Sequence, residues 1–157
     1  MLVSEAMKNF RYILHDVSGE YNDAACLLRL NHAAHYVAHA LAAMSSPLVV
    51  TEEPLTEGGR VPDGFLRTCG SYPLRLTGTG VHFLDGSKEM SVRFFREPTP
   101  LTDATEEMPF PLASLNDFTV RLAAMYALNR NEFDVSQDKG LLDELAALAK
   151  SALGGAS

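Results

Sequence analysis

Hydrophobic positions in the first third of the chain recur at helical spacing. Residues 3–14 follow the rhythm of a short amphipathic helix, which Ser18-Gly19 ends. A longer helix is expected from Asn22, a favourable N-cap, to about Ser45. Ser46-Pro47 closes it because the residue before a proline avoids helical backbone angles. Residues 1–46 are therefore predicted to form a helical hairpin.

The longer of these helices has two unlike faces. Its apolar face is expected to pack on the core and comprises Leu27, Leu30, Ala34, Val37, Leu41 and Met44. The opposite face carries His32, His35 and His39, which lie within about 60° of one another at about 100° per residue. If this histidine face binds a metal or a substrate, the chain is a metal protein or an enzyme. If it contacts another subunit, the chain is an assembly module.

Between residues 48 and 97 the apolar positions alternate as they do in strands. Strands are expected at residues 48–51, 65–68, 74–77, 81–84 and 90–96. The turn Asp85-Gly86-Ser87-Lys88 is typical of a hairpin. These segments predict a small antiparallel β-meander, with Glu52-Glu53 in an exposed loop.

The last third begins with an acidic, proline-rich segment at residues 98–112, which contains Asp103, Glu106 and Glu107 and no basic residue. That composition predicts an extended arm or surface loop rather than a packed element. Residues 113–153 return to helical spacing and predict two helices, the second beginning near Ser136. The chain is thus expected to be a single α+β domain over residues 1–157, in which the helices pack with the meander.

Charge and composition exclude several classes of protein. The formal net charge is −7, and residues 98–157 hold four Lys/Arg against nine Asp/Glu. Wrapping of nucleic acid needs clustered basic residues, and the chain has no such cluster. No apolar run approaches the ~20 residues of a membrane span, so no membrane partner is expected. The two cysteines, Cys26 and Cys69, are too few for a disulfide framework and are expected to be free thiols.

The histidine face is the one cluster with ligand chemistry. His35 and His39 are spaced as in a zinc-protease helix, but Tyr36 occupies the position where such an enzyme has its glutamate. His32 and His39 lie ~10 Å apart along the helix axis, so one ion cannot be shared by all three. We expect no metal and no cofactor. The alternative is a small metal-binding protein or enzyme that uses His32, His35 and His39.

Other catalytic signatures are missing from the sequence. Gly78-Thr79-Gly80 lacks the third glycine and the following helix of a dinucleotide loop, and no Walker lysine or Gly-x-Ser-x-Gly elbow is present. The paired carboxylates Glu52-Glu53 and Glu106-Glu107 are expected to be solvated in loops. His15 and His82 have no visible partner. The prediction is a protein without catalytic residues that is not an enzyme.

Three passages carry a family resemblance. They are Phe10-Arg11-Tyr12-Ile13-Leu14-His15-Asp16 with Tyr21-Asn22-Asp23 and residues 27–33, then Val61-Pro62-Asp63-Gly64-Phe65-Leu66-Arg67, and then Leu115-Asn116-Asp117-Phe118 to Ala127. Together with the order of elements, they resemble the head–tail connector (adaptor) proteins of tailed bacteriophages. The first is similar to that family's opening helices, the second to the proline-led start of its β-region, and the third to its C-terminal helical segment.

The resemblance implies a structural protein of the virion, located at the head–tail interface after assembly in the host cytoplasm. It implies a homo-oligomeric ring of about twelve copies between the portal protein and a tail or nozzle protein. DNA would pass through this ring without sequence-specific binding. The subunit or partner contacts would then include His32, His35, His39, Asp103, Glu106 and Glu107. A tail-completion or tail-terminator protein is the alternative within the same class.

Overall fold

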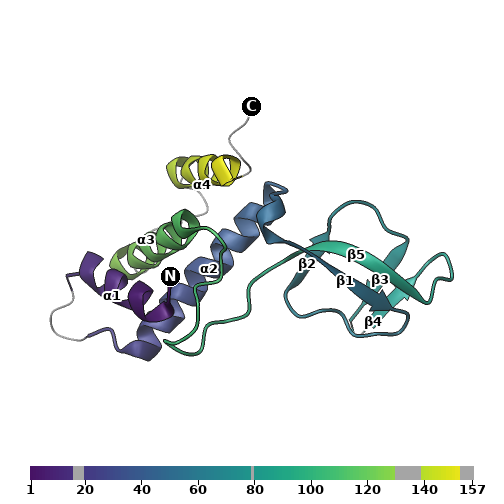
Figure 1. The fold of residues 1–157 in the computed structure, drawn as a ribbon, viewed down its shortest axis with the longest axis horizontal. Helices are drawn as coiled ribbons and strands as arrows, with labels where there is room; N and C mark the ends of the chain where they lie inside the picture. The colour runs from purple at the N-terminus through teal and green to yellow at the C-terminus, as the bar shows by residue number, and fades with distance from the viewer. Residues whose placement is uncertain (16–19, 79, 130–138, 153–157) are drawn as a thin grey trace.

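The computed structural model describes residues 1–15, 20–78, 80–129 and 139–152. Its helices gather in one lobe and its strands in another, and α2 reaches from the first lobe to the junction with the second (Figure 1). The helices are α1 (Val3–Ile13), α2 (Asp23–Ala43), α3 (Ala113–Asn129) and α4 (Lys139–Ala152). The predicted α+β class is confirmed. None of the described helices is both long and apolar enough to cross a membrane.

The two ends of α2 are specified by local chemistry. At its start the Asn22 side chain accepts a hydrogen bond from the Ala25 N–H at 2.9 Å, as expected of an N-cap. At its end Ser45 adopts a positive φ of 56°, and the Ser46 N–H donates back to the Leu41 carbonyl. This is a Schellman ending, with serine where glycine is usual. The predicted limits of this helix are thus confirmed.

The strands are β1 (Val50–Thr56), β2 (Phe65–Thr68), β3 (Leu74–Thr77), β4 (Gly80–Phe83) and β5 (Glu89–Arg96), with a 3₁₀ turn η1 (Pro47–Val49) before β1. They are antiparallel, as predicted, but they do not follow one another as a simple meander. The β5 strand lies between β1 and β2, and among the described strands β3 pairs with β4 alone. The strands β3 and β4 pair directly, with Thr77 opposite Gly80, whereas the turn at residues 85–88 connects β4 and β5, which do not pair in the described sheets.

The first strand corrects one prediction. The segment predicted as a strand at residues 48–51 is a 3₁₀ turn through Val49, and β1 then continues to Thr56. Glu52 and Glu53 therefore lie in a strand, not in a loop. Both carboxylates contact the neighbouring strand β5. Glu52 accepts a hydrogen bond from the Ser91 hydroxyl, and Glu53 forms an ion pair with Arg96.

Each lobe has its own hydrophobic core, and β5 contributes to both. Phe94 is fully buried among the strands, whereas the next residue, Phe95, is buried in the core of the helical lobe. Successive side chains of a strand point to opposite faces, so one strand can serve two cores. A second link is made by Arg67 of β2, which donates to the Ala42 carbonyl at the end of α2.

The acidic segment 98–112 is packed, which corrects the prediction of an exposed arm. Figure 1 shows it running from the end of β5 past α2 to the start of α1. Leu101, Met108 and Phe110 are buried in the helical core. The backbone also pairs with the chain start, since Val3 N–H donates to the Glu106 carbonyl and Met108 N–H to the Met1 carbonyl. The segment therefore holds α1 against the rest of the lobe.

Candidate functional site

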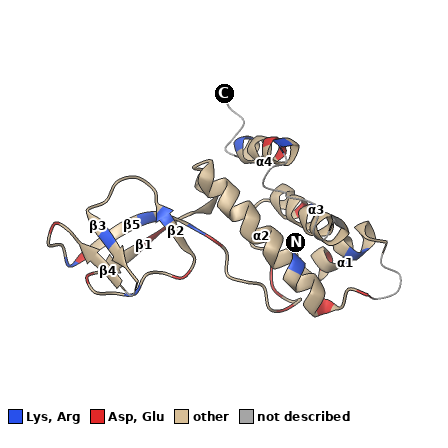
Figure 2. Cartoon of the chain, turned by 180° about the vertical axis from the view of Figure 1, so that it is seen from behind, with Lys and Arg blue, Asp and Glu red and all other residues tan. Residues whose placement is uncertain are grey.

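The histidine face of α2 is exposed, as predicted, but its three members do not act together. Beyond Arg29 the helix carries no charged residue, so the histidines are its main polar groups there (Figure 2). His32 stacks on Tyr126 of α3, with ring centroids 4.5 Å apart and planes 8° apart. His35 and His39 lie beside each other, with ring centroids 4.2 Å apart. The structure thus separates His32 from the other two.

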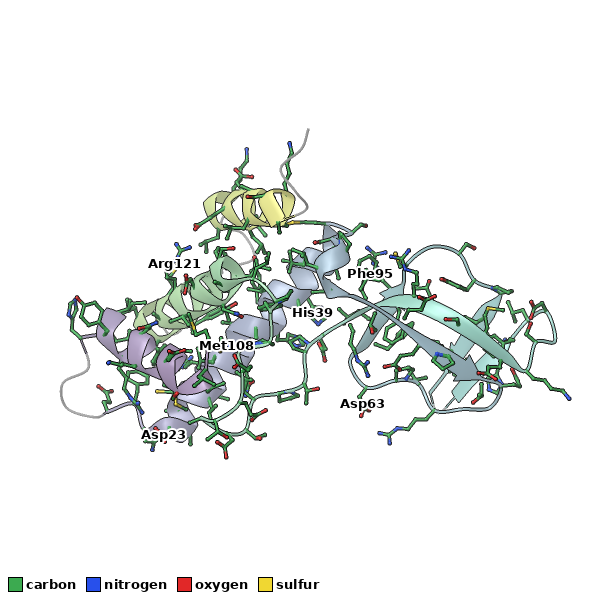
Figure 3. The ribbon with its side chains drawn as sticks, viewed as in Figure 1. Asp23, His39, Asp63, Phe95, Met108 and Arg121 are labelled. Atoms are coloured by element: carbon green, nitrogen blue, oxygen red, sulfur yellow. The ribbon has the colours of Figure 1, made fainter. Side chains whose placement is uncertain are left out.

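His35 and His39 meet a carboxylate that no sequence pattern indicated. Nδ1 of His35 lies 2.9 Å from Oε2 of Glu97, and Nε2 of His39 lies 2.8 Å from the same oxygen. Glu97 directly follows β5 and is 58 residues from His39. In Figure 3, His39 lies on α2 beside the segment that leaves β5. One donor atom from each of the three residues lies within 4.8 Å of the others.

The two histidines of this cluster are exposed, and its carboxylate is half-buried. The side chains of His35 and His39 are 57% and 47% exposed, and that of Glu97 is 30% exposed. In the described ranges, no other group of three His, Cys, Asp or Glu side chains converges in this way. The cluster is therefore the leading candidate site in this part of the chain.

A shallow groove of about 260 Å³ begins at His35 and Glu97 and runs between α2 and the segment that follows β5. Asn31 joins the two walls, because its side-chain amide donates to the Leu101 carbonyl at 2.9 Å and its oxygen accepts from the Leu101 N–H at 2.7 Å. Pockets for small organic ligands usually enclose about 300–1,000 Å³. The groove is thus close to the lower end of this range.

The predicted acidic contact residues have partners within the chain. Glu106 accepts hydrogen bonds from the Thr102 N–H, the Thr102 hydroxyl and the Asp103 N–H, and Asp103 accepts two from Thr105. The Thr102 N–H, followed by the Thr102 hydroxyl and the Asp103 N–H, lowers the pKa of Glu106. Glu107 lies 3.4 Å from the N-terminal amine. Asp103 and Glu106 therefore stabilise a turn, Glu107 pairs with the start of the chain, and none of the three belongs to the histidine cluster.

Stability should therefore depend on the charge of Glu106. Its pKa is lower in the folded chain, so its contribution is present above the ordinary value of 4.5 and is lost as the pH falls through the lowered pKa. We expect Glu106→Gln to lower the melting temperature at neutral pH, and the gap to wild type to close in acid. Melting curves followed by circular dichroism across this pH range would measure it. Glu107→Gln removes the same charge from an exposed neighbour and should have a smaller effect; equal effects would contradict the assignment.

A second histidine–carboxylate pair lies in the β lobe. The sequence shows no partner for His82, but its Nδ1 lies 3.0 Å from Oε1 of Glu57. The other oxygen of Glu57 accepts the Phe83 N–H at 2.6 Å. The Phe83 N–H is the main cause that lowers the pKa of Glu57, and His82 is the next. This pair has a single histidine, and both oxygens of Glu57 already have partners. It differs in this from the cluster at Glu97, where two histidines contact one oxygen.

No protein-family model matches this chain, and no curated protein matches it.

Proposed function

We propose that this chain is a structural assembly protein, a head–tail connector (adaptor) of a tailed bacteriophage that forms a ring between the portal and the tail. The observation that carries the proposal is that large apolar side chains are exposed on both lobes. Leu28 on α2 is 67% exposed, Leu128 on α3 is 63% exposed and Leu84 beyond β4 is 68% exposed. A protomer in a closed ring needs two unlike lateral surfaces, because head-to-tail contacts are heterologous.

The edges of the larger sheet support the same proposal. In the order β1–β5–β2, the two outer strands each pair on one side only within the described sheet. Unpaired strand edges are available to another chain and are usually protected in monomeric proteins.

The proposal is tested by assembly. Purified protein, alone and mixed with the phage's portal protein, would be examined by native mass spectrometry and negative-stain electron microscopy. We expect closed rings, which the connector resemblance puts at about twelve copies, because head-to-tail contacts that close generate rings. A protein that stays monomeric and does not bind the portal would contradict the proposal.

Variants would connect the rings to the exposed apolar residues. Leu84→Asp and Leu128→Asp should reduce ring assembly, because each places a charge where an apolar contact is expected, while the melting temperature should change little. Ser71→Asp is the matched control, since it adds the same charge at an exposed polar position of the β lobe. If all three variants assemble like the wild type, these apolar residues are not the subunit contacts.

A further inference from the structure

We propose that His35, His39 and Glu97 bind a divalent transition-metal ion, with zinc the best fit. Two imidazole nitrogens and one carboxylate oxygen are a donor set that suits Zn²⁺. Two ligands come from adjacent turns of α2 and the third from the residue after β5. This inference goes beyond the connector function and does not depend on ring assembly.

The geometry of the donors is close to what zinc requires. Zinc binds nitrogen at about 2.0–2.1 Å and oxygen at about 2.0–2.2 Å, so two donors in a tetrahedral site are about 3.4 Å apart. Each histidine nitrogen is 2.8–2.9 Å from Oε2 of Glu97, which is a hydrogen-bond distance. Entry of an ion requires each nitrogen to move about 0.5 Å away from Oε2, while the two nitrogens, which lie within 4.8 Å of each other, come to the same tetrahedral spacing. Small side-chain rotations can supply this, because all three side chains are partly exposed.

The convergence of the donors distinguishes this cluster from an ordinary hydrogen-bonded pair. A carboxylate has two oxygens, yet both imidazoles approach the same one. Three donor atoms within 4.8 Å of one another can close around one ion, whereas the Glu57–His82 pair offers one imidazole and has its second oxygen occupied by a backbone N–H. The chain therefore contains both the candidate site and a natural comparison for it.

The ion would connect the two lobes. Glu97 follows β5 and begins the segment that crosses α2, so a bond from Glu97 to the two histidines would join the end of the sheet to the helical lobe. Three protein ligands leave a fourth tetrahedral position for water or for a group from another molecule. Because the site exists only in the folded chain, binding should raise the melting temperature.

The test is metal binding by the full chain without an affinity tag. After treatment with a chelator, the protein would be titrated with Zn²⁺ and analysed by isothermal titration calorimetry and elemental analysis, and with Co²⁺ by visible absorption. We expect one ion per chain and a higher melting temperature. His35→Gln and Glu97→Gln should each abolish stoichiometric binding and the thermal shift. His32→Gln and His82→Gln should retain both, because His32 stacks on Tyr126 and His82 pairs with Glu57.

Several results would overturn the proposal. Wild-type protein that binds neither ion stoichiometrically has no such site, and this result needs no variant. Binding that persists in both His35→Gln and Glu97→Gln would locate the ion elsewhere. A thiolate charge-transfer band in the cobalt spectrum would assign it to Cys69 or Cys26 instead. Far-ultraviolet circular dichroism of each variant would verify that loss of metal is not loss of fold.

Discussion

Phe95→Ala should lower the free energy of unfolding by about 3–5 kcal/mol. The Phe95 side chain is 1% exposed and lies in the helical core although it belongs to β5. Its ring also carries the Arg67 guanidinium, whose carbon is 4.3 Å from the ring centroid. Figure 3 labels Phe95 at the junction, near the end of α2. Removal of the ring would leave a cavity between the lobes. It would also remove the surface on which the Arg67 guanidinium packs, and so weaken the hydrogen bond from Arg67 to the Ala42 carbonyl at the end of α2. Urea denaturation followed by circular dichroism would measure the loss.

Phe94→Ala is the matched control. The two phenylalanines are adjacent and both are buried, so the loss of apolar contact should be similar, but Phe94 lies in the core of the β lobe. Hydrogen exchange should distinguish them. Phe95→Ala should speed exchange at the C-terminal end of α2, whereas Phe94→Ala should speed it in the strands and leave α2 protected. A loss below about 1 kcal/mol for Phe95→Ala, or the same exchange pattern for both variants, would show that Phe95 does not couple the lobes.

Asn116→Leu should destabilise the protein by about 2–4 kcal/mol, although leucine is similar in size and apolar. Asn116 is 3% exposed, its oxygen accepts the Phe110 N–H at 3.1 Å, and its amide donates to the Phe110 carbonyl at 2.9 Å. Leucine would leave both backbone groups of Phe110 buried without these partners. Thermal and urea denaturation would measure the change.

The control for Asn116 is Thr119→Val on the same helix. Thr119 is fully buried, and its hydroxyl donates to the Leu115 carbonyl at 2.7 Å. That carbonyl lies within α3 and can still accept its helical hydrogen bond, so loss of the hydroxyl should cost about 1 kcal/mol or less. If both substitutions cost the same, the loss of the two hydrogen bonds to Phe110 is not what destabilises Asn116→Leu.

The limits of most elements could be predicted because they depend on neighbours in the sequence. The first two helices begin and end close to the predicted residues, and β2 and β3 match residue for residue. The order of the strands could not be predicted in this way. The pairing of β5 with both β1 and β2 joins residues such as Val50 and Phe95, which lie far apart in the chain. Alternation shows that a strand has a buried face but does not identify its neighbour.

The packing of the acidic segment had a partial signal in the sequence. Its prolines and acids indicate an exposed loop, but Leu101, Met108 and Phe110 also lie within it, and all three are buried. The average composition of the segment is polar, so it does not show that these three apolar positions are buried. Asn31 and Asn116 hydrogen-bond to the backbone of the segment. The sequence does not indicate these bonds, because a side-chain amide and the backbone group that it binds have no fixed separation along the chain.

The sequence by itself determined the two-faced helix and the pairing of His35 with His39, because one helical turn separates residues i and i+4 in any helix. Only the tertiary structure decided that His32 turns to Tyr126 and that Glu97 joins the other two histidines. The physical reason is distance along the chain. Helical periodicity relates residues within a few turns, whereas the contact between His39 and Glu97 spans 58 residues and depends on how the β5 strand meets the helical lobe.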